Sequence, residues 1–265
     1  MGFLTDHVTA VRRRLRADPL PHDTLATAAA AAPPARAFEA ALRQAAVADG
    51  VAVIAEVKRA SPSAGTIAPN LDPVAQAIAY ANGGAAAISV LTEPEHFGGS
   101  LEDLRAVRAA TDPPVLRKDF LVHPDQVLES RAAGADAVLV IVATVDDDEL
   151  AALVGVSRAV GMEPLVETHG DRDLERALES DARVIGVNAR DLESLQVDPV
   201  AALGRLARID ASRFTVLESG IRTREDVRAA TDAGASAILV GETLMRAGDP
   251  SATLRALIHG KESIA

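Results

Sequence analysis

The sequence predicts an α/β protein, a (β/α)8 TIM barrel in which eight parallel strands alternate with helices. Apolar, β-branched segments recur along the 265 residues, and helical patterns separate them. In three places, 83–88, 134–139 and 234–239, glycine ends a helix and an apolar strand follows after a short turn. Such alternation implies parallel pairing through right-handed crossovers, and eight units close naturally into a barrel. An open doubly wound sheet is the alternative, but no G-x-G-x-x-G follows the first strand and no Walker A motif occurs.

The eight expected strands are apolar and rich in β-branched residues. In chain order they cover 51–58, 85–92, 115–120, 137–143, 164–168, 184–190, 214–219 and 237–241. The Ala- and Leu-rich segments between them are expected to be helices. An acidic run at 146–149 precedes one of these segments. We interpret it as a helix start, where carboxylates interact favourably with the helix dipole, rather than as a metal site.

Residues 1–50 precede the first expected strand and are predicted to form a helical extension. An amphipathic helix is expected over 3–17 and another over 37–46, with a break between them at Pro33 and Pro34. The alanine-rich stretch 26–32 also favours a helix. We expect this extension to pack on a catalytic barrel formed by residues 51–265, so that the chain makes a single domain.

Composition argues against several classes of function. The net charge of −11 argues against a nucleic-acid partner, which would need a basic face. Without cysteine the chain has no disulfide, no thiolate nucleophile and no Cys-ligated metal. The six histidines are not spaced as ligand pairs, so no metal site is expected. No apolar segment is long enough to span a membrane and the N-terminus lacks the order of a signal peptide, which predicts a cytoplasmic protein.

Polar side chains stand at the carboxyl ends of the expected strands, where barrel enzymes place their active sites. Glu56 and Lys58 are two residues apart at the end of the first strand, so they point to the same side. Burying such charges costs several kcal/mol per ion unless something repays it. The other strand ends supply Lys118, Glu167, Asn188, Arg190, Glu218 and Glu242. One such residue could be part of a structural ion pair, but a ring of them predicts an active site.

Two further observations suggest a phosphorylated substrate and acid–base chemistry. Ser219, Gly220 and Gly241 follow the last two strands, where barrels often bind phosphate through backbone N–H groups; simple tight turns are the alternative. A lysine beside another cation in a partly desolvated site has a lowered pKa and can donate a proton near neutral pH. His169, two residues after Glu167, is expected to pack or lie on the surface.

Resemblance to a known family begins in segment 54–63, which reads IAEVKRASPS. This segment resembles the signature of the indole-3-glycerol phosphate synthases. The resemblance continues in order through the barrel, at 91–93, 97–101, 116–120, 162–167, 185–192, 217–221 and 239–246. It implies a carboxy-lyase of tryptophan biosynthesis that closes an indole ring. The substrate would be 1-(2-carboxyphenylamino)-1-deoxyribulose 5-phosphate, the products indole-3-glycerol phosphate, carbon dioxide and water, and no cofactor would be needed.

The resemblance also implies roles for individual residues. Lys118 would be the general acid that protonates the substrate's ketone oxygen, and Glu167 would be the acid–base group of the later dehydration. Lys58 would hold the substrate electrostatically and share proton transfer with Lys118, while Glu56 and Asn188 would orient these groups. Arg190 would bind the carboxylate and Glu218 the hydroxyls. The residues around the phosphate would be Ser61, Ser219, Gly220, Gly241 and Glu242. Those around the aromatic ring would be Phe97, Phe120, Leu139 and Leu192.

Two departures from the family pattern and two rival functions stay open at this point. The extension resembles the family only loosely, and Ala189 stands where the family usually carries a polar residue, although this position should point out of the lumen. A phosphoribosylanthranilate isomerase would rely on a cysteine that this chain lacks. A non-catalytic paralogue would be expected to lose the charged strand ends. The expected partner is a phosphorylated small molecule, with no nucleic acid and no membrane, and the chain is expected to be a monomer or a weak homodimer.

Overall fold

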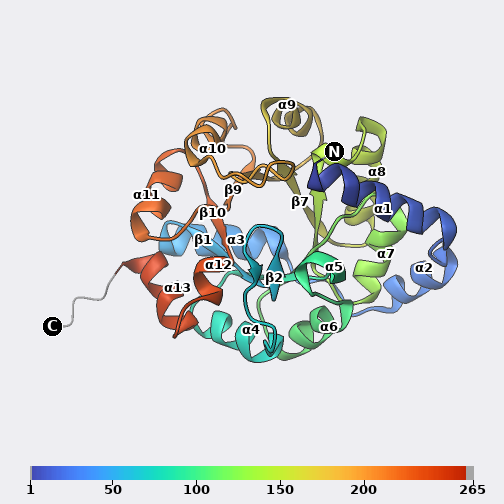
Figure 1. Ribbon diagram of the computed structural model, residues 1–265, viewed down its shortest axis with the longest axis horizontal. Coiled ribbons are helices and arrows are strands. Elements are labelled where there is room, and N and C mark those ends of the chain that lie inside the picture. The colour runs from blue at the N-terminus through green and yellow to red at the C-terminus, as the bar shows by residue number, and fades with distance from the viewer. Residues whose placement is uncertain (1, 261–265) are drawn as a thin grey trace.

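The computed structural model describes residues 2–260 and has a closed barrel of parallel strands at its centre (Figure 1). The strands are β1 (Ala52–Val57), β4 (Ala87–Leu91), β5 (Val115–Lys118), β6 (Ala137–Ile141), β7 (Glu163–Thr168), β8 (Val184–Asn188), β9 (Phe214–Glu218) and β10 (Ala237–Val240). Strand β1 pairs with both β10 and β4, which closes the barrel and excludes the open sheet. The predicted (β/α)8 fold is confirmed. Each strand lies within its predicted range except β7, which begins one residue earlier.

A ring of helices surrounds the barrel and covers the outer faces of the strands (Figure 1). These helices are α4 (Pro73–Asn82), α6 (Leu101–Ala110), α7 (Pro124–Ala132), α8 (Asp147–Ala159), α9 (Asp171–Glu179), α10 (Pro199–Leu206), α11 (Arg224–Asp232) and α13 (Pro250–His259). The acidic run at 146–149 begins α8 as predicted. Asp146 accepts a hydrogen bond from the backbone of Glu149, whose side chain accepts one from the backbone of Asp146 in return.

Three helices precede the barrel: α1 (Phe3–Ala17), α2 (His22–Ala31) and α3 (Phe38–Asp49). Helix α3 packs against β1, whereas α2 lies beside α7. Helix α1 reaches the carboxyl end of the barrel, where the backbone of Thr5 donates to Glu193 at 3.1 Å and Arg12 pairs with Glu149 at 2.7 Å. The helix predicted over 3–17 is confirmed, and the one predicted over 37–46 is three residues longer at its C-terminal end.

Short elements after the strand ends form the mouth of the barrel. They are β2 (Ala60–Ser61), β3 (Gly65–Thr66), α5 (Pro94–Phe97), the 3-10 helix η1 (Val142–Thr144) and α12 (Glu242–Met245). In the view of Figure 1, β2, α5 and α12 lie around the barrel opening. The long helices thus form the outer layer of the barrel, while the short segments at the strand ends surround its opening.

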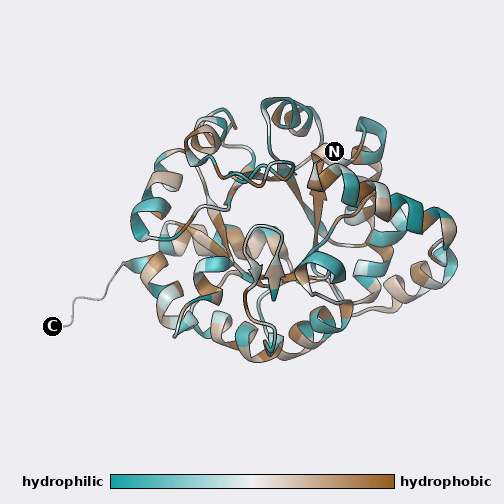
Figure 2. Ribbon diagram, in the orientation of Figure 1, coloured by the Kyte–Doolittle hydropathy of each residue, from teal (hydrophilic) through white to brown (hydrophobic). Residues whose placement is uncertain are grey.

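Hydropathy follows this division of the chain. Figure 2 shows hydrophobic residues concentrated on the strands and hydrophilic residues on the outer turns of the helices. Ile54, Ile88, Leu116 and Leu165 are fully buried in the core. Burial of apolar surface contributes roughly 25 cal/mol of free energy per Å². This contribution helps the fold to tolerate buried charges at one end of the barrel. Among the described residues, no helix has the length and apolar composition needed to cross a bilayer.

Candidate active site

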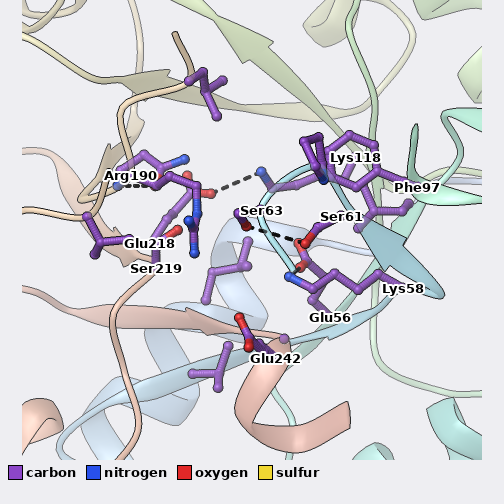
Figure 3. Close-up of a pocket in the computed structure, with 18 of the residues that line it drawn as sticks. Glu56, Lys58, Ser61, Ser63, Phe97, Lys118, Arg190, Glu218, Ser219 and Glu242 are labelled. Atoms are coloured by element: carbon purple, nitrogen blue, oxygen red, sulfur yellow. Dashed lines mark hydrogen bonds and ion pairs between the residues drawn. The ribbon is translucent and has the colours of Figure 1, made fainter. Parts of the chain in front are cut away.

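The strand ends and mouth segments enclose a cavity of about 500 Å³ (Figure 3). Every residue predicted for the site lines it: Glu56, Lys58, Ser61, Phe97, Lys118, Phe120, Leu139, Glu167, Asn188, Arg190, Leu192, Glu218, Ser219, Gly220, Gly241 and Glu242. These residues converge because parallel strands of a barrel all end at the same rim. In Figure 3, Lys118 and Glu218 lie on facing sides of the cavity, and Glu56 and Lys58 lie together on another.

A buried group of three charged residues lies deepest in the site. The Lys118 Nζ of β5 is 2.9 Å from Glu167 Oε2 of β7 and 3.2 Å from Glu218 Oε2 of β9. The side chains of Glu167 and Glu218 are 1% and 2% exposed, and that of Lys118 is 13% exposed. Removing these ions from water costs several kcal/mol each, which their mutual attraction and hydrogen bonds must offset. Because such burial contributes little net stability, the arrangement indicates a catalytic rather than a structural role.

The carboxylates determine the charge of Lys118. Burial opposes the ammonium, but Glu167, Glu218 and Glu56 outweigh burial and raise the pKa of Lys118 above its usual value. The prediction of a lowered pKa is therefore wrong, because the charges closest to Lys118 are carboxylates rather than Lys58. Lys118 is therefore a cation at neutral pH and a weaker acid than an ordinary lysine, so its proton can pass only to a strongly basic acceptor such as an oxygen that is becoming an alkoxide.

The two carboxyl groups have opposite shifts. Burial raises the pKa of Glu218 well above its usual range, and the neighbouring charge of Glu167 raises it further. Burial also opposes ionisation of Glu167, but Lys118 and then His169 lower its pKa well below the usual range. Lys118 therefore keeps its charge, Glu167 ionises more readily than an ordinary glutamate, and Glu218 keeps its proton to higher pH than an ordinary glutamate, a division of labour typical of paired catalytic groups.

A second ion pair stands beside this group at the end of β1. Lys58 Nζ lies 2.7 Å from Glu56 Oε1. Gly241 leaves the space for it, because a Cβ at this position would overlap the Glu56 carboxylate and lie 3.0 Å from Lys58 Nζ. Gly186 does the same for Glu218, whose carboxylate a Cβ there would overlap. Sequence reasoning assigned Gly241 to phosphate alone and missed Gly186.

Asn188 and Arg190 link the buried group to the rim. Asn188 Nδ2 donates to Glu167 Oε1 at 3.2 Å, and Asn188 Oδ1 accepts from the backbone of Arg190 at 2.9 Å. The Arg190 guanidinium donates to the carbonyl of Leu195 at 2.9 Å. This loop therefore holds a cation at the edge of the cavity.

The segment after β9 has an unusual backbone. Ser219 has a φ of 66° and Gly220 a φ of 80°, so both lie in the left-handed region. For the non-glycine residue this costs on the order of 1–3 kcal/mol, which is usually tolerated only at functional sites. The Glu242 carboxylate at the start of α12 pairs with Arg246 at 3.0 Å. This pairing compensates the negative charge of the Glu242 carboxylate, which would otherwise repel a phosphate.

Part of the cavity lining is apolar. Phe97, Phe120, Leu139 and Leu192 all belong to it, and the rings of Phe97 and Phe120 are 6.3 Å apart. Phe3 of α1 also lines the cavity, with its ring 6.2 Å from that of Phe120. No local pattern marks Phe3 as a site residue, so sequence reasoning missed it.

Two histidine positions make contacts that the sequence did not show. The His169 side chain is packed inside the protein, one of the two roles expected for it, and its Nε2 lies 2.9 Å from Glu167 Oε1. His7 and His96 are far apart in the sequence and not spaced as a ligand pair, yet their ring centroids are 5.0 Å apart, and Glu93 and Glu95 are near both. Sequence spacing could not show this, because α1 brings His7 onto α5 from a distant part of the chain.

Comparisons with known proteins place these features in a family. The family model described as indole-3-glycerol phosphate synthase matches residues 4–257. The chain is 50% identical over 250 residues to "Indole-3-glycerol phosphate synthase 2" of Streptomyces coelicolor, covering 94% of each protein. It is also 50% identical over 231 residues to "Indole-3-glycerol phosphate synthase" of Mycobacterium ulcerans, covering 87% of this chain and 84% of that one.

Solved structures support the fold. A 3-hexulose-6-phosphate synthase superimposes with a TM-score of 0.61 at 20% identity, over 78% of this chain and 98% of that one. The tryptophan synthase subunit alpha of Legionella pneumophila gives a TM-score of 0.59 at 13% identity, over 83% of this chain and 96% of that one. At such low identity these likenesses concern the barrel alone.

Proposed function

The chain belongs to the indole-3-glycerol phosphate synthase family, the decarboxylating lyases of tryptophan biosynthesis, and we propose that its barrel mouth carries out the family's reaction as follows. The reaction converts 1-(2-carboxyphenylamino)-1-deoxyribulose 5-phosphate into indole-3-glycerol phosphate, carbon dioxide and water. The observation that carries the assignment of roles is the Lys118 ammonium, held between Glu167 and Glu218 at 2.9 and 3.2 Å.

Substrate binding uses the two ends of the cavity. The aromatic ring lies against the apolar wall of Phe97, Phe120, Leu139 and Leu192, with its carboxylate toward Arg190. The phosphate lies across the cavity near Ser61, Ser219, Gly220, Gly241 and the backbone of Glu242. The left-handed backbone at Ser219 and Gly220 and the lack of a side chain at Gly241 let the backbone approach an anion there. Lys58 holds the substrate electrostatically, with Glu56 fixing its ammonium.

Lys118 drives the ring closure. The ring carbon that bears the carboxylate attacks the ketone carbon, and the new C–C bond pushes an electron pair onto the ketone oxygen. The Lys118 ammonium donates its proton to that oxygen. The C–COO⁻ bond then breaks, carbon dioxide leaves and the electron pair restores the aromatic ring. A positioned general acid accelerates such a step by roughly 10²–10⁴-fold.

Glu167 acts in the dehydration that follows. Lys118 has now lost its charge and with it the main cause of the low pKa of Glu167, so Glu167 can take up from solvent the one proton that the overall reaction consumes. It delivers that proton to the hydroxyl formed at the former ketone, which leaves as water. The neighbouring carbon of the new ring loses a proton to the neutral Lys118 amine, which becomes an ammonium again. Asn188 and His169 hold Glu167 in place, and Glu218 contacts the substrate's hydroxyls.

The remaining inferences concern the setting of the enzyme. We infer that it acts in the cytoplasm on a small phosphorylated molecule, as a monomer or a weak homodimer. The helical extension and the barrel act as one domain, since α1 supplies Phe3 to the cavity.

Indole fluorescence tests this function directly. The chain contains no tryptophan, so indole emission from the product has almost no protein background. The purified protein is mixed with the carboxyphenylamino-deoxyribulose phosphate, and emission is followed. We expect emission to rise with the wild type and to stay flat with Lys118→Met. Saturable binding of the substrate without emission from the wild type would instead indicate a non-catalytic protein.

A further inference from the structure

Four potential metal ligands meet between α1 and α5, separate from the buried charged group. They are His7 of α1 with Glu93, Glu95 and His96 of the segment that follows β4. One ligand atom from each lies within 4.8 Å of all the others. Two imidazoles and two carboxylates are a ligand set that suits zinc, whereas magnesium and calcium prefer oxygen ligands alone.

The backbone of α5 fixes the central carboxylate of this cluster. Glu93 accepts hydrogen bonds from the backbone N–H groups of Glu95, His96 and Phe97 at 2.9, 2.7 and 3.1 Å. Only the first of these reaches Oε1, so this oxygen keeps a free lone pair. Glu93 Oε1 lies 3.5 Å from His96 Nδ1 and 4.0 Å from His7 Nε2.

His7 points into the cluster without a hydrogen-bond partner. It is 8% exposed, and neither ring nitrogen has a partner among the described residues; nor does Nδ1 of His96. A buried polar atom left unsatisfied destabilises the fold, a cost that a phenylalanine at this position would avoid.

We propose that His7, Glu93 and His96, with Glu95 as the fourth ligand, bind one divalent transition-metal ion of the zinc type. Zinc bonds of about 2.0–2.2 Å place tetrahedral ligands roughly 3.3–3.5 Å apart. The observed separations of 3.5 and 4.0 Å need only small side-chain adjustments to reach this spacing. Glu95 is exposed and free to swing inward.

The ion fastens the N-terminal helix to the wall of the substrate cavity. Phe3 lies one turn before His7, stacks on its ring at 5.8 Å and packs edge-on against His96 at 5.0 Å. Phe3 also lines the cavity beside Phe120. A metal bound by His7 and His96 therefore holds Phe3 against the cavity. This role is structural and does not rest on the catalytic assignments above.

Calorimetric titration of the metal-free full-length protein with Zn²⁺ tests the proposal. Two variants remove a ligand in different ways. His7→Phe keeps an aromatic ring in the buried cluster, whereas His96→Gln changes a side chain that is only partly buried. At least one of the two variants should therefore fold. His123→Gln is the matched control, because His123 lies on another loop near His22 and Asp125. We expect one ion per wild-type chain and, in both cluster variants, at least about tenfold weaker binding, with the control unchanged.

Two further readouts locate the ion. Cobalt bound in place of zinc should give the visible absorption of a four-coordinate site, and Zn²⁺ should slow hydrogen exchange in α1 of the wild type but not of His96→Gln. No binding by the wild type would overturn the proposal, as would equal binding by all variants. Loss of binding in His123→Gln alone would place the ion at the His22, Asp125 and His123 surface cluster and would also overturn it.

Discussion

Replacing Lys118 with methionine should destabilise the fold in a way that depends strongly on pH. Methionine fills nearly the same volume, so the packing of β5 changes little. The substitution removes the cation that lies 2.9 Å from Glu167 and 3.2 Å from Glu218 and leaves two carboxyl groups buried together. Removing one partner of a buried ion pair costs about 3–5 kcal/mol when the other stays charged.

The sign of the pH dependence follows from Glu167. In the wild type its pKa is lowered, so it contributes stability above its unfolded value of about 4.3, and this contribution is lost as pH falls. In Lys118→Met the main cause of that lowering is gone, and burial together with Glu218 raises the pKa instead. The variant therefore loses stability as pH rises above about 4.3. The difference between the two proteins should grow with pH.

Urea unfolding followed by circular dichroism measures this difference, since the chain lacks tryptophan as a fluorescent probe. We expect Lys118→Met to lose about 3–5 kcal/mol at pH 8 and about 1.5 kcal/mol or less at pH 4, where protonation removes the buried charge. Arg246→Met is the control, because its pair with Glu242 is half-exposed and should contribute under about 1 kcal/mol. A loss of equal size at both pH values would show that a buried Glu167 charge is not the cause of the destabilisation.

Three other substitutions probe the site. Glu218→Gln should gain stability relative to the wild type as pH rises above the unfolded glutamate pKa of about 4.3, since the raised pKa of Glu218 makes the wild type lose stability as pH rises; a difference that does not change with pH would count against a raised pKa of Glu218. Gly241→Val should raise KM and also lower the free energy of unfolding by about 1–3 kcal/mol, because the valine side chain would displace the Glu56–Lys58 pair. An unchanged KM would indicate that the phosphate binds at another part of the cavity. Gly186→Ala should lower kcat, because the added methyl group would crowd the Glu218 carboxylate. A kcat equal to that of the wild type would contradict this expectation.

The barrel and most of its mouth could be predicted from sequence for a local physical reason. Strands of a parallel barrel are buried on both faces, so they stand out as apolar runs, and the polar residues that end them are necessarily at one rim. The start of β7 was misplaced by one residue, because Glu163 at its first position pairs with Arg158 at 2.6 Å and looks like a loop residue.

Features that depend on distant contacts could not be predicted in this way. The raised pKa of Lys118 depends on β5, β7 and β9 pointing their carboxyl-end residues at one another across the barrel. Likewise, Phe3 and His7 reach the mouth because Thr5 bonds to Glu193 and Arg12 to Glu149, residues far along the chain. No periodicity within α1 encodes those partners.

Carbon dioxide release and indole emission, measured in the same single-turnover experiment, separate the role of Lys118 from that of Glu167. Ring closure and decarboxylation depend on Lys118 in this account, and dehydration depends on Glu167. Lys118→Met should therefore release neither product. Glu167→Gln should release carbon dioxide but form indole about 10²-fold or more slowly, as expected for a lost acid–base group. Release of carbon dioxide by Lys118→Met at the wild-type rate, or equal loss of both signals in Glu167→Gln, would contradict the account.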